Sequence, residues 1–272
     1  MAGSKRRAVI VGINTYPGAP LAGCVADAYA AATRLEEIYK FPRWGIRVVT
    51  NERATAAAIK ERLAWLVSGA QPGDELVYCF SGHGVQMAAR NDAGEVDKMD
   101  ECQCPYDFAW SEATVLRDNY LSQVFSRLPA GAHLTVISDS CHSGTLAREW
   151  SPIKRITGRT RRARTMPLHA DVAWRNVAAV GVRRADRNAI VVSGAWLEAC
   201  LDRQTAADAW FGGKPRGAFS HVLDQALDAN PGGKLTEIAA MVARGLRREG
   251  FAQVPLFEGT ELHRPFLGGI PQ

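Results

Sequence analysis

Two apolar runs that each end at a short polar segment constrain the fold of this chain most strongly. Residues 76–80 lead directly into the Ser-Gly-His-Gly of residues 81–84, and residues 134–137 lead into the Ser-Asp-Ser-Cys of residues 138–141. Short continuous apolar runs are typical of strands buried on both faces of a parallel sheet. Because chemistry in such sheets lies beyond the carboxyl ends of the strands, we expect the two polar segments at the same edge.

Strands and helices alternate along the rest of the chain. Apolar runs predict further strands at 8–13, 46–49, 189–192 and 254–257. Apolar residues at helical spacing predict helices at 25–39, 55–67, 119–128, 219–227 and 235–248. Residues 85–113 have the composition of an acidic loop. The alternation predicts an α/β fold with a mostly parallel central sheet and helices on both faces.

The composition excludes several other classes of protein. With 47% apolar and 22% charged residues in 272, the chain is neither disordered nor a coiled coil. Its six cysteines are scattered and form no C-x-x-C pair, so they indicate neither a disulfide framework nor a zinc ribbon. The first apolar run is shorter than the core of a signal peptide, and no window reaches the length of a membrane span. We therefore expect a cytoplasmic protein with no membrane partner.

The positive charge is concentrated in one segment. Residues 148–187 contain ten arginines and one lysine but only three acids, whereas the rest of the chain is mildly acidic. This segment shows no regular periodicity before about residue 171, and we interpret it as an exposed linker. A nucleic-acid-binding arm is the alternative. Its only aromatic residues, Trp150 and Trp174, lie near its edges rather than between the basic residues, which argues against nucleic acid as a partner.

His83 and Cys141 are the candidate catalytic residues. A cysteine nucleophile needs a nearby base and backbone donors for the developing oxyanion, and glycines around both residues allow close approach of the backbone. Taken singly, Cys141 could be a small buried residue and His83 a turn residue. Their positions after two predicted strands favour a shared cleft.

The segments around His83 and Cys141 closely resemble the motifs of the metacaspases, the caspase-like cysteine peptidases, and the chain looks like a bacterial type. Residues 8–14 and 21–28 resemble the family's first strand and following loop, and residues 191–195, 217–219 and 253–255 resemble its small-subunit half. The resemblance implies a caspase-like fold. Its expected parts are a catalytic half at 1–147, a basic cleavable linker at 148–187 and a small-subunit-like half at 188–272.

The resemblance also implies a role for each matching residue. Cys141 would be the nucleophile, His83 its proton partner, and the backbone amides of Gly84 and Cys141 the oxyanion hole. An acidic substrate pocket would be formed by Asp27 and Asp139 with Cys24 and Ser81. Two carboxylates in a cleft suit a guanidinium or ammonium group, so the expected activity is cleavage of proteins after Arg or Lys.

The basic linker fits that specificity. An Arg-specific peptidase and an Arg-rich linker are compatible, and the family is often cut in this region during activation. The candidate processing residues are Arg159, Arg161, Arg162 and Arg164. Whether the cut is made in cis, in trans or by a separate activating protease stays open. A further hypothesis is that the linker covers the acidic pocket of the zymogen until it is removed.

The resemblance implies no organic cofactor, and it leaves calcium open. Many metacaspases bind calcium through acids that follow the histidine motif, and oxygen ligands suit this ion. The candidate acids here are Asp92, Asp97, Asp100 and Glu101. The alternative interpretation is a solvated acidic loop without a metal.

Two other classes of function remain as alternatives to a peptidase. A catalytically silent caspase-like adaptor would usually lack the histidine or the cysteine, and both are present here. A nucleic-acid-binding protein would lose its affinity steeply with salt and on deletion of the basic linker.

Overall fold

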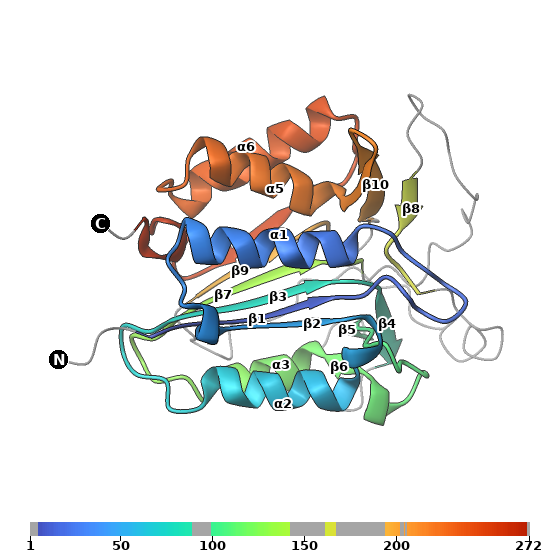
Figure 1. Ribbon diagram of the computed structural model, residues 1–272, viewed down its shortest axis with the longest axis horizontal. Coiled ribbons are helices and arrows are strands. Elements are labelled where there is room, and N and C mark those ends of the chain that lie inside the picture. The colour runs from blue at the N-terminus through green and yellow to red at the C-terminus, as the bar shows by residue number, and fades with distance from the viewer. Residues whose placement is uncertain are drawn as a thin grey trace.

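A six-stranded sheet forms the centre of the computed structural model (Figure 1). The described residues are 5–88, 99–141, 161–166, 194–201, 204 and 206–270. The sheet consists of β1 (Arg6–Gly12), β2 (Ile46–Thr50), β3 (Glu75–Ser81), β7 (His133–Asp139), β9 (Gly194–Glu198) and β12 (Leu256–Gly259). Their order is β12-β9-β7-β3-β1-β2, and every neighbouring pair is parallel except β12 with β9. The prediction of a mostly parallel sheet is confirmed.

Helices cover both faces of this sheet (Figure 1). One face carries α1 (Cys24–Glu37), α5 (Ala218–Ala229) and α6 (Leu235–Arg248), and the other carries α2 (Ala56–Val67) and α3 (Asp118–Phe125). The side chains of β1 alternate between the two cores because successive residues of a strand point to opposite faces. Ala8 and Ile10 pack in the core with α1 and α5, whereas Val9 and Val11 pack in the core with α2 and α3. Because both faces of β1 are buried over residues 8–11, its sequence there must be apolar without interruption.

The expectation of a loop at 85–113 is correct for residues 104–113 but wrong for residues 85–88 and 99–103. There β4 (Gly84–Ala88) pairs antiparallel with β5 (Met99–Gln103), which pairs with β6 (Leu116–Arg117). The polar composition is misleading because Asp100 and Glu101 are buried. Asp100 lies 2.5 Å from the Arg117 guanidinium and also accepts a hydrogen bond from Asn119. A solvated acidic loop is therefore the wrong interpretation for these two acids.

A third sheet brings the basic segment against the C-terminal part of the chain. It consists of β8 (Arg161–Ala163), β10 (Ala207–Phe211) and β11 (Lys214–Gly217), in the order β11-β10-β8. None of these three strands is predicted by the hydrophobic pattern. The view of this segment as without regular structure is wrong at β8, which pairs antiparallel with β10. The view of it as exposed holds for Arg162 but is wrong for Arg164, which is buried.

Most predicted elements lie within a few residues of the observed ones. The strand expected at 254–257 is shifted to Leu256–Gly259, and the strand expected at 189–192 lies outside the described residues. Short helical turns occupy Arg43–Gly45, Asn51–Arg53, Glu112–Thr114 and Phe266–Gly268. Across the part of the chain that the structure describes, no helix combines the length and the apolar character needed to cross a bilayer.

Candidate active site

The two reactive segments lie side by side at the carboxyl edge of the central sheet. In the register between β3 and β7, Ser81 is paired with Asp139, so residues 82–84 and 140–141 leave the sheet from adjacent strand ends. His83 and Cys141 are both buried there, at 2% and 0% exposure. The parallel pairing of two strands thus joins segments that are far apart in the sequence.

His83 is held by contacts that fix its tautomer. Its Nε2 atom lies 2.7 Å from the carbonyl oxygen of Ala19, which can only accept a hydrogen bond, so Nε2 carries the hydrogen. Nδ1 is therefore the basic nitrogen, and it makes no hydrogen bond of regular geometry within the described part of the chain. Tyr16 packs its ring against the imidazole, and its hydroxyl accepts a hydrogen bond from the His83 amide. Because Nδ1 carries no hydrogen, it is the nitrogen of His83 that can accept a proton.

Arg164 fills the acidic pocket expected for a substrate side chain. Its guanidinium is fully buried, with Nη2 2.7 Å from Asp27 Oδ2 and Nη1 3.2 Å from Asp139 Oδ2. Nη1 also donates to the Ser81 hydroxyl at 2.6 Å. Cys24 is fully buried in the same cluster, where the charges of Arg164, Asp208 and Asp27 act on its thiol. All four residues of the expected pocket therefore gather around one arginine of the chain itself.

The backbone of Arg164 lies across the site as a peptide would. Its carbonyl oxygen accepts hydrogen bonds from the amides of Gly84 at 3.1 Å and Cys141 at 3.3 Å. Its own amide donates to the carbonyl of Ala206, continuing the β8–β10 ladder. On the other side of the 164–165 peptide bond, the Met166 amide donates to the carbonyl of Gly84. Both sides of that peptide bond are thus held by backbone contacts.

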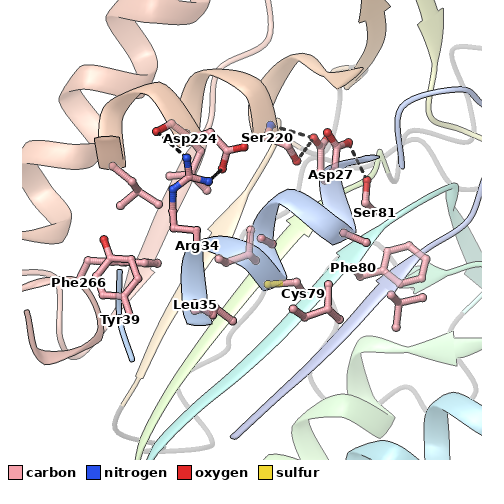
Figure 2. A pocket seen from close by; sticks show the side chains of 18 residues that line it. Asp27, Arg34, Leu35, Tyr39, Cys79, Phe80, Ser81, Ser220, Asp224 and Phe266 are labelled. Carbon is pink, nitrogen blue, oxygen red and sulfur yellow. Dashed lines mark hydrogen bonds and ion pairs between the residues drawn. The ribbon is translucent and has the colours of Figure 1, made fainter. Parts of the chain in front are cut away.

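Asp27 connects this pocket to a chain of ion pairs. Its Oδ1 atom lies 2.6 Å from Arg216 Nε, and Arg216 Nη2 lies 2.5 Å from Asp224 on α5. Figure 2 shows Asp27 projecting from α1 toward Ser81, and Arg34, further along the same helix, beside Asp224. Asp27 lies in the first turn of α1, but its contacts are those of a buried ion-pair site.

Burial and charge act in opposite directions on these groups. Burial raises the pKa of Asp139, and the Arg164 guanidinium opposes that shift. Burial of the imidazole is also the main reason that the pKa of His83 is lowered to about 4. Removal of the cation would leave buried carboxylates without their partner, which is unfavourable in a low-dielectric site. The empty pocket therefore favours a cationic side chain.

The intact Cys141→Ala chain is expected to lose stability as the pH falls from about 6.5 to about 4. In this range the unfolded chain protonates His83 while the folded chain does not, so acid favours unfolding by about 2–3 kcal/mol at the lower end. Denaturant unfolding at pH 4.5 and pH 7 measures the loss. Adding His83→Gln should reduce the difference in the free energy of unfolding between pH 4.5 and pH 7 by that amount. If the stability depends on pH identically with and without His83→Gln, the lowered pKa of His83 is contradicted.

Four residues of the site were missed in the sequence. Asp208 and Arg216 contact the acidic pocket, Ala206 accepts the Arg164 amide, and Tyr16 supports His83. A signal for the strands that carry Asp208 and Arg216 exists in Gly212-Gly213. Both glycines have positive φ, 56° and 81°, as a two-residue hairpin turn requires.

Other expected site residues are only partly described. Arg159 and the calcium candidates Asp92 and Asp97 lie outside the described residues, as does the side chain of Arg161. Arg162 is exposed and donates to the carbonyl of Pro20. Among the described residues, no three or more His, Cys, Asp or Glu side chains form a group that could hold a metal ion.

The overall fold is caspase-like. The chain superposes on caspase-1 from Spodoptera frugiperda with a TM-score of 0.61 at 12% identity, over 99% of this chain and 91% of that one. Its similarity to the crystal structure of protein GSU0716 from Geobacter sulfurreducens is greater, with a TM-score of 0.70 at 25% identity over 98% and 100% of the two chains. The architecture thus defines a protein of the caspase-like class.

The family follows from the sequence comparisons. The model of the metacaspase, peptidase C14 domain matches residues 6–148. Metacaspase-9 of Arabidopsis thaliana is 30% identical over 92% of both chains, and metacaspase-2 of Trypanosoma brucei brucei is 30% identical over 95% of this chain and 74% of its own. The chain belongs to the metacaspase family and is therefore a cysteine-type peptidase, a hydrolase that acts on proteins.

Proposed function

We propose that this protein is an endopeptidase that cleaves proteins after Arg or Lys, with Cys141 as nucleophile and His83 as its proton partner. The observation that carries the proposal is the seating of Arg164. Its guanidinium lies among Asp27, Asp139 and Ser81 while its carbonyl accepts hydrogen bonds from the amides of Gly84 and Cys141. One residue thus makes both contacts that an Arg-specific peptidase needs with its substrate.

The proposed reaction begins with transfer of the Cys141 thiol proton to Nδ1 of His83. The thiolate attacks the carbonyl carbon, and the amides of Gly84 and Cys141 stabilise the negative oxygen that forms. Collapse of this intermediate breaks the C–N bond, and His83 returns the proton to the leaving amine. Water then hydrolyses the thioester, which releases the new carboxylate and restores the thiol.

The same contacts support control by the basic linker. While residues 161–166 lie in the site, β10 and the acidic pocket are occupied and a substrate has no access to either. We propose that the intact chain is a zymogen and that cleavage after Arg164 in cis starts its activation. Among the candidate processing residues that the structure describes, Arg164 is the one whose carbonyl accepts hydrogen bonds from the amides of Gly84 and Cys141.

The substrates are short peptides that carry a fluorophore after their last residue. The wild-type chain is expected to release the fluorophore when that residue is Arg or Lys and to leave peptides ending in Asp intact. The acidic pocket attracts a cation and repels a carboxylate, so we expect a difference of at least about a thousandfold in kcat/KM. The rates are measured on one peptide backbone, with and without calcium, while a gel follows the linker.

The order of events tests the role of the linker. Peptide cleavage should begin with a lag that ends as the chain is cut between residues 164 and 165. Cleavage after Asp, or full activity while the linker is still intact, would contradict the proposal.

A further inference from the structure

Asp208 adds a third carboxylate to the acidic pocket, from a different part of the chain. It lies on β10, is 4% exposed, and its Oδ1 atom is 3.0 Å from Nη2 of Arg164. Asp27 approaches the same nitrogen from α1, at 2.7 Å. The outer nitrogen of the bound guanidinium is therefore held between carboxylates from the two halves of the molecule.

The position of this contact distinguishes Arg from Lys. The other outer nitrogen, Nη1, is bound by the Ser81 hydroxyl and by the backbone carbonyl of Asp139. A lysine side chain is one atom shorter and ends in a single nitrogen, so it cannot occupy both outer positions of the guanidinium. A carboxylate directed at Nη2 therefore stabilises a bound arginine more than a bound lysine.

Asp208 is fixed in place before any substrate binds. Its Oδ2 accepts the amide of Ala22 at 2.8 Å, and its Oδ1 accepts the amide of Gly23 at 3.0 Å. A Cβ atom at residue 23 would lie 2.6 Å from Asp208 Oδ1, so this approach requires glycine. Because these amides hold both carboxylate oxygens, little conformational entropy is lost when a cation binds.

Among the described residues, the charge of Asp208 has no second cation to balance it. Asp27 keeps Arg216 as an ion-pair partner, at 2.6 Å, whatever occupies the pocket. Within the described ranges, Arg164 is the one cationic side chain paired with Asp208. When residues 161–166 leave the site, the buried Asp208 carboxylate loses Arg164 as its ion-pair partner, and a substrate guanidinium restores the pair.

We propose that Asp208 is a specificity-determining residue that makes this peptidase prefer Arg over Lys at the cleaved bond. The inference rests on the proposed function and goes beyond it, because the pocket of Asp27 and Asp139 alone accepts either cation. Asp208 also ties the loop before α1 to β10, so a role confined to structure would reduce cleavage after Arg and Lys alike.

The test compares kcat/KM for two peptides that differ only in Arg or Lys at the cleaved bond. It uses the full chain after its linker has been cut, at concentrations set by active-site titration. Asp208→Asn should lower the value for Arg by about 10–100-fold, as expected for loss of a buried charge-assisted hydrogen bond, and the value for Lys by about fivefold or less. Asp228→Asn is the matched control. Asp228 lies on α5, is largely exposed and forms an ion pair with Arg34 of α1. The control variant should leave both values unchanged.

An unchanged ratio of Arg to Lys cleavage in Asp208→Asn would overturn the inference while leaving the proposed function intact. A wild-type protein that cuts neither peptide would instead overturn the proposed function. If Asp208→Asn cuts neither peptide, the affinities of the two peptides for an inactive chain test the inference instead. The dissociation constants of the two peptides are measured with the Cys141→Ala, Arg164→Gln chain, with and without Asp208→Asn. A fall of about tenfold in the Arg-to-Lys affinity ratio supports the inference, and an unchanged ratio overturns it.

Discussion

The Arg164→Gln chain is expected to be cut between residues 164 and 165 at least about thirtyfold more slowly than the wild-type chain. Glutamine keeps the backbone of the segment but provides no cation for Asp27 and Asp139, whose contacts with Arg164 are buried. Loss of one partner of a buried, hydrogen-bonded charge pair costs about 2–5 kcal/mol, which corresponds to this change in rate or more. Mass spectrometry of the fragments identifies the bond that is cut.

Arg162→Gln is the matched control for this experiment. Arg162 lies on β8, two residues before Arg164, but its side chain is exposed and donates to the carbonyl of Pro20. We expect this variant to be cut at 164–165 at the wild-type rate. A wild-type fragment that ends at Arg159 or Arg162 instead of Arg164 would contradict the assignment of the processing site.

The concentration dependence of the cut adds an independent check. Because the 164–165 bond lies in the site of its own chain, cleavage should be first-order, with a half-time that does not change over a hundredfold dilution. A half-time that lengthens in proportion to dilution would indicate cleavage in trans. The Cys141→Ala chain mixed with active enzyme reports the rate of that second route directly.

The central sheet and its reactive edge could be predicted because they depend on local sequence patterns. Strands buried on both faces must be apolar throughout, and β3 and β7 meet this requirement until they reach Ser81 and Asp139. Parallel pairing then brings His83 and Cys141 to one edge. The residues of the acidic pocket were found through resemblance, since Asp27 alone reads as a charge near the N-terminus of a helix.

The second half of the pocket could not be predicted because its residues depend on pairing between distant segments. Asp208 lies 44 residues beyond Arg164, and β8 and β10 are short strands whose apolar pattern does not alternate clearly. The burial of Arg164 was missed for the same reason. A run of arginines reads as a solvated linker unless the carboxylates that neutralise one of them are known to lie opposite.

Cys141→Ala is expected to lower peptidase activity by about 10⁴-fold or more and to stop cleavage of the linker. Removal of a nucleophile eliminates the covalent route and leaves only binding and oxyanion stabilisation. The substitution keeps the backbone amide that donates to the Arg164 carbonyl, so the variant should still hold residues 161–166 in the site. Activity is followed with an Arg-ending peptide, and the linker is followed by intact mass.

Cys200→Ala controls for the loss of a thiol as such. The Cys200 thiol is buried and donates to the carbonyls of Gln204 and Ser140, and the side chains of Cys200 and Cys141 belong to the same apolar cluster. Removal of the Cys200 thiol should leave activity within about tenfold of wild type. The amides that bind the Arg164 carbonyl belong to Gly84 and Cys141, not to Cys200. Equal activity in Cys141→Ala and wild type would exclude Cys141 as nucleophile. If wild type stays inactive even after a trypsin-like protease has cut its linker, the chain is a silent adaptor, because neither the blocked pocket nor a missing cut then explains the inactivity.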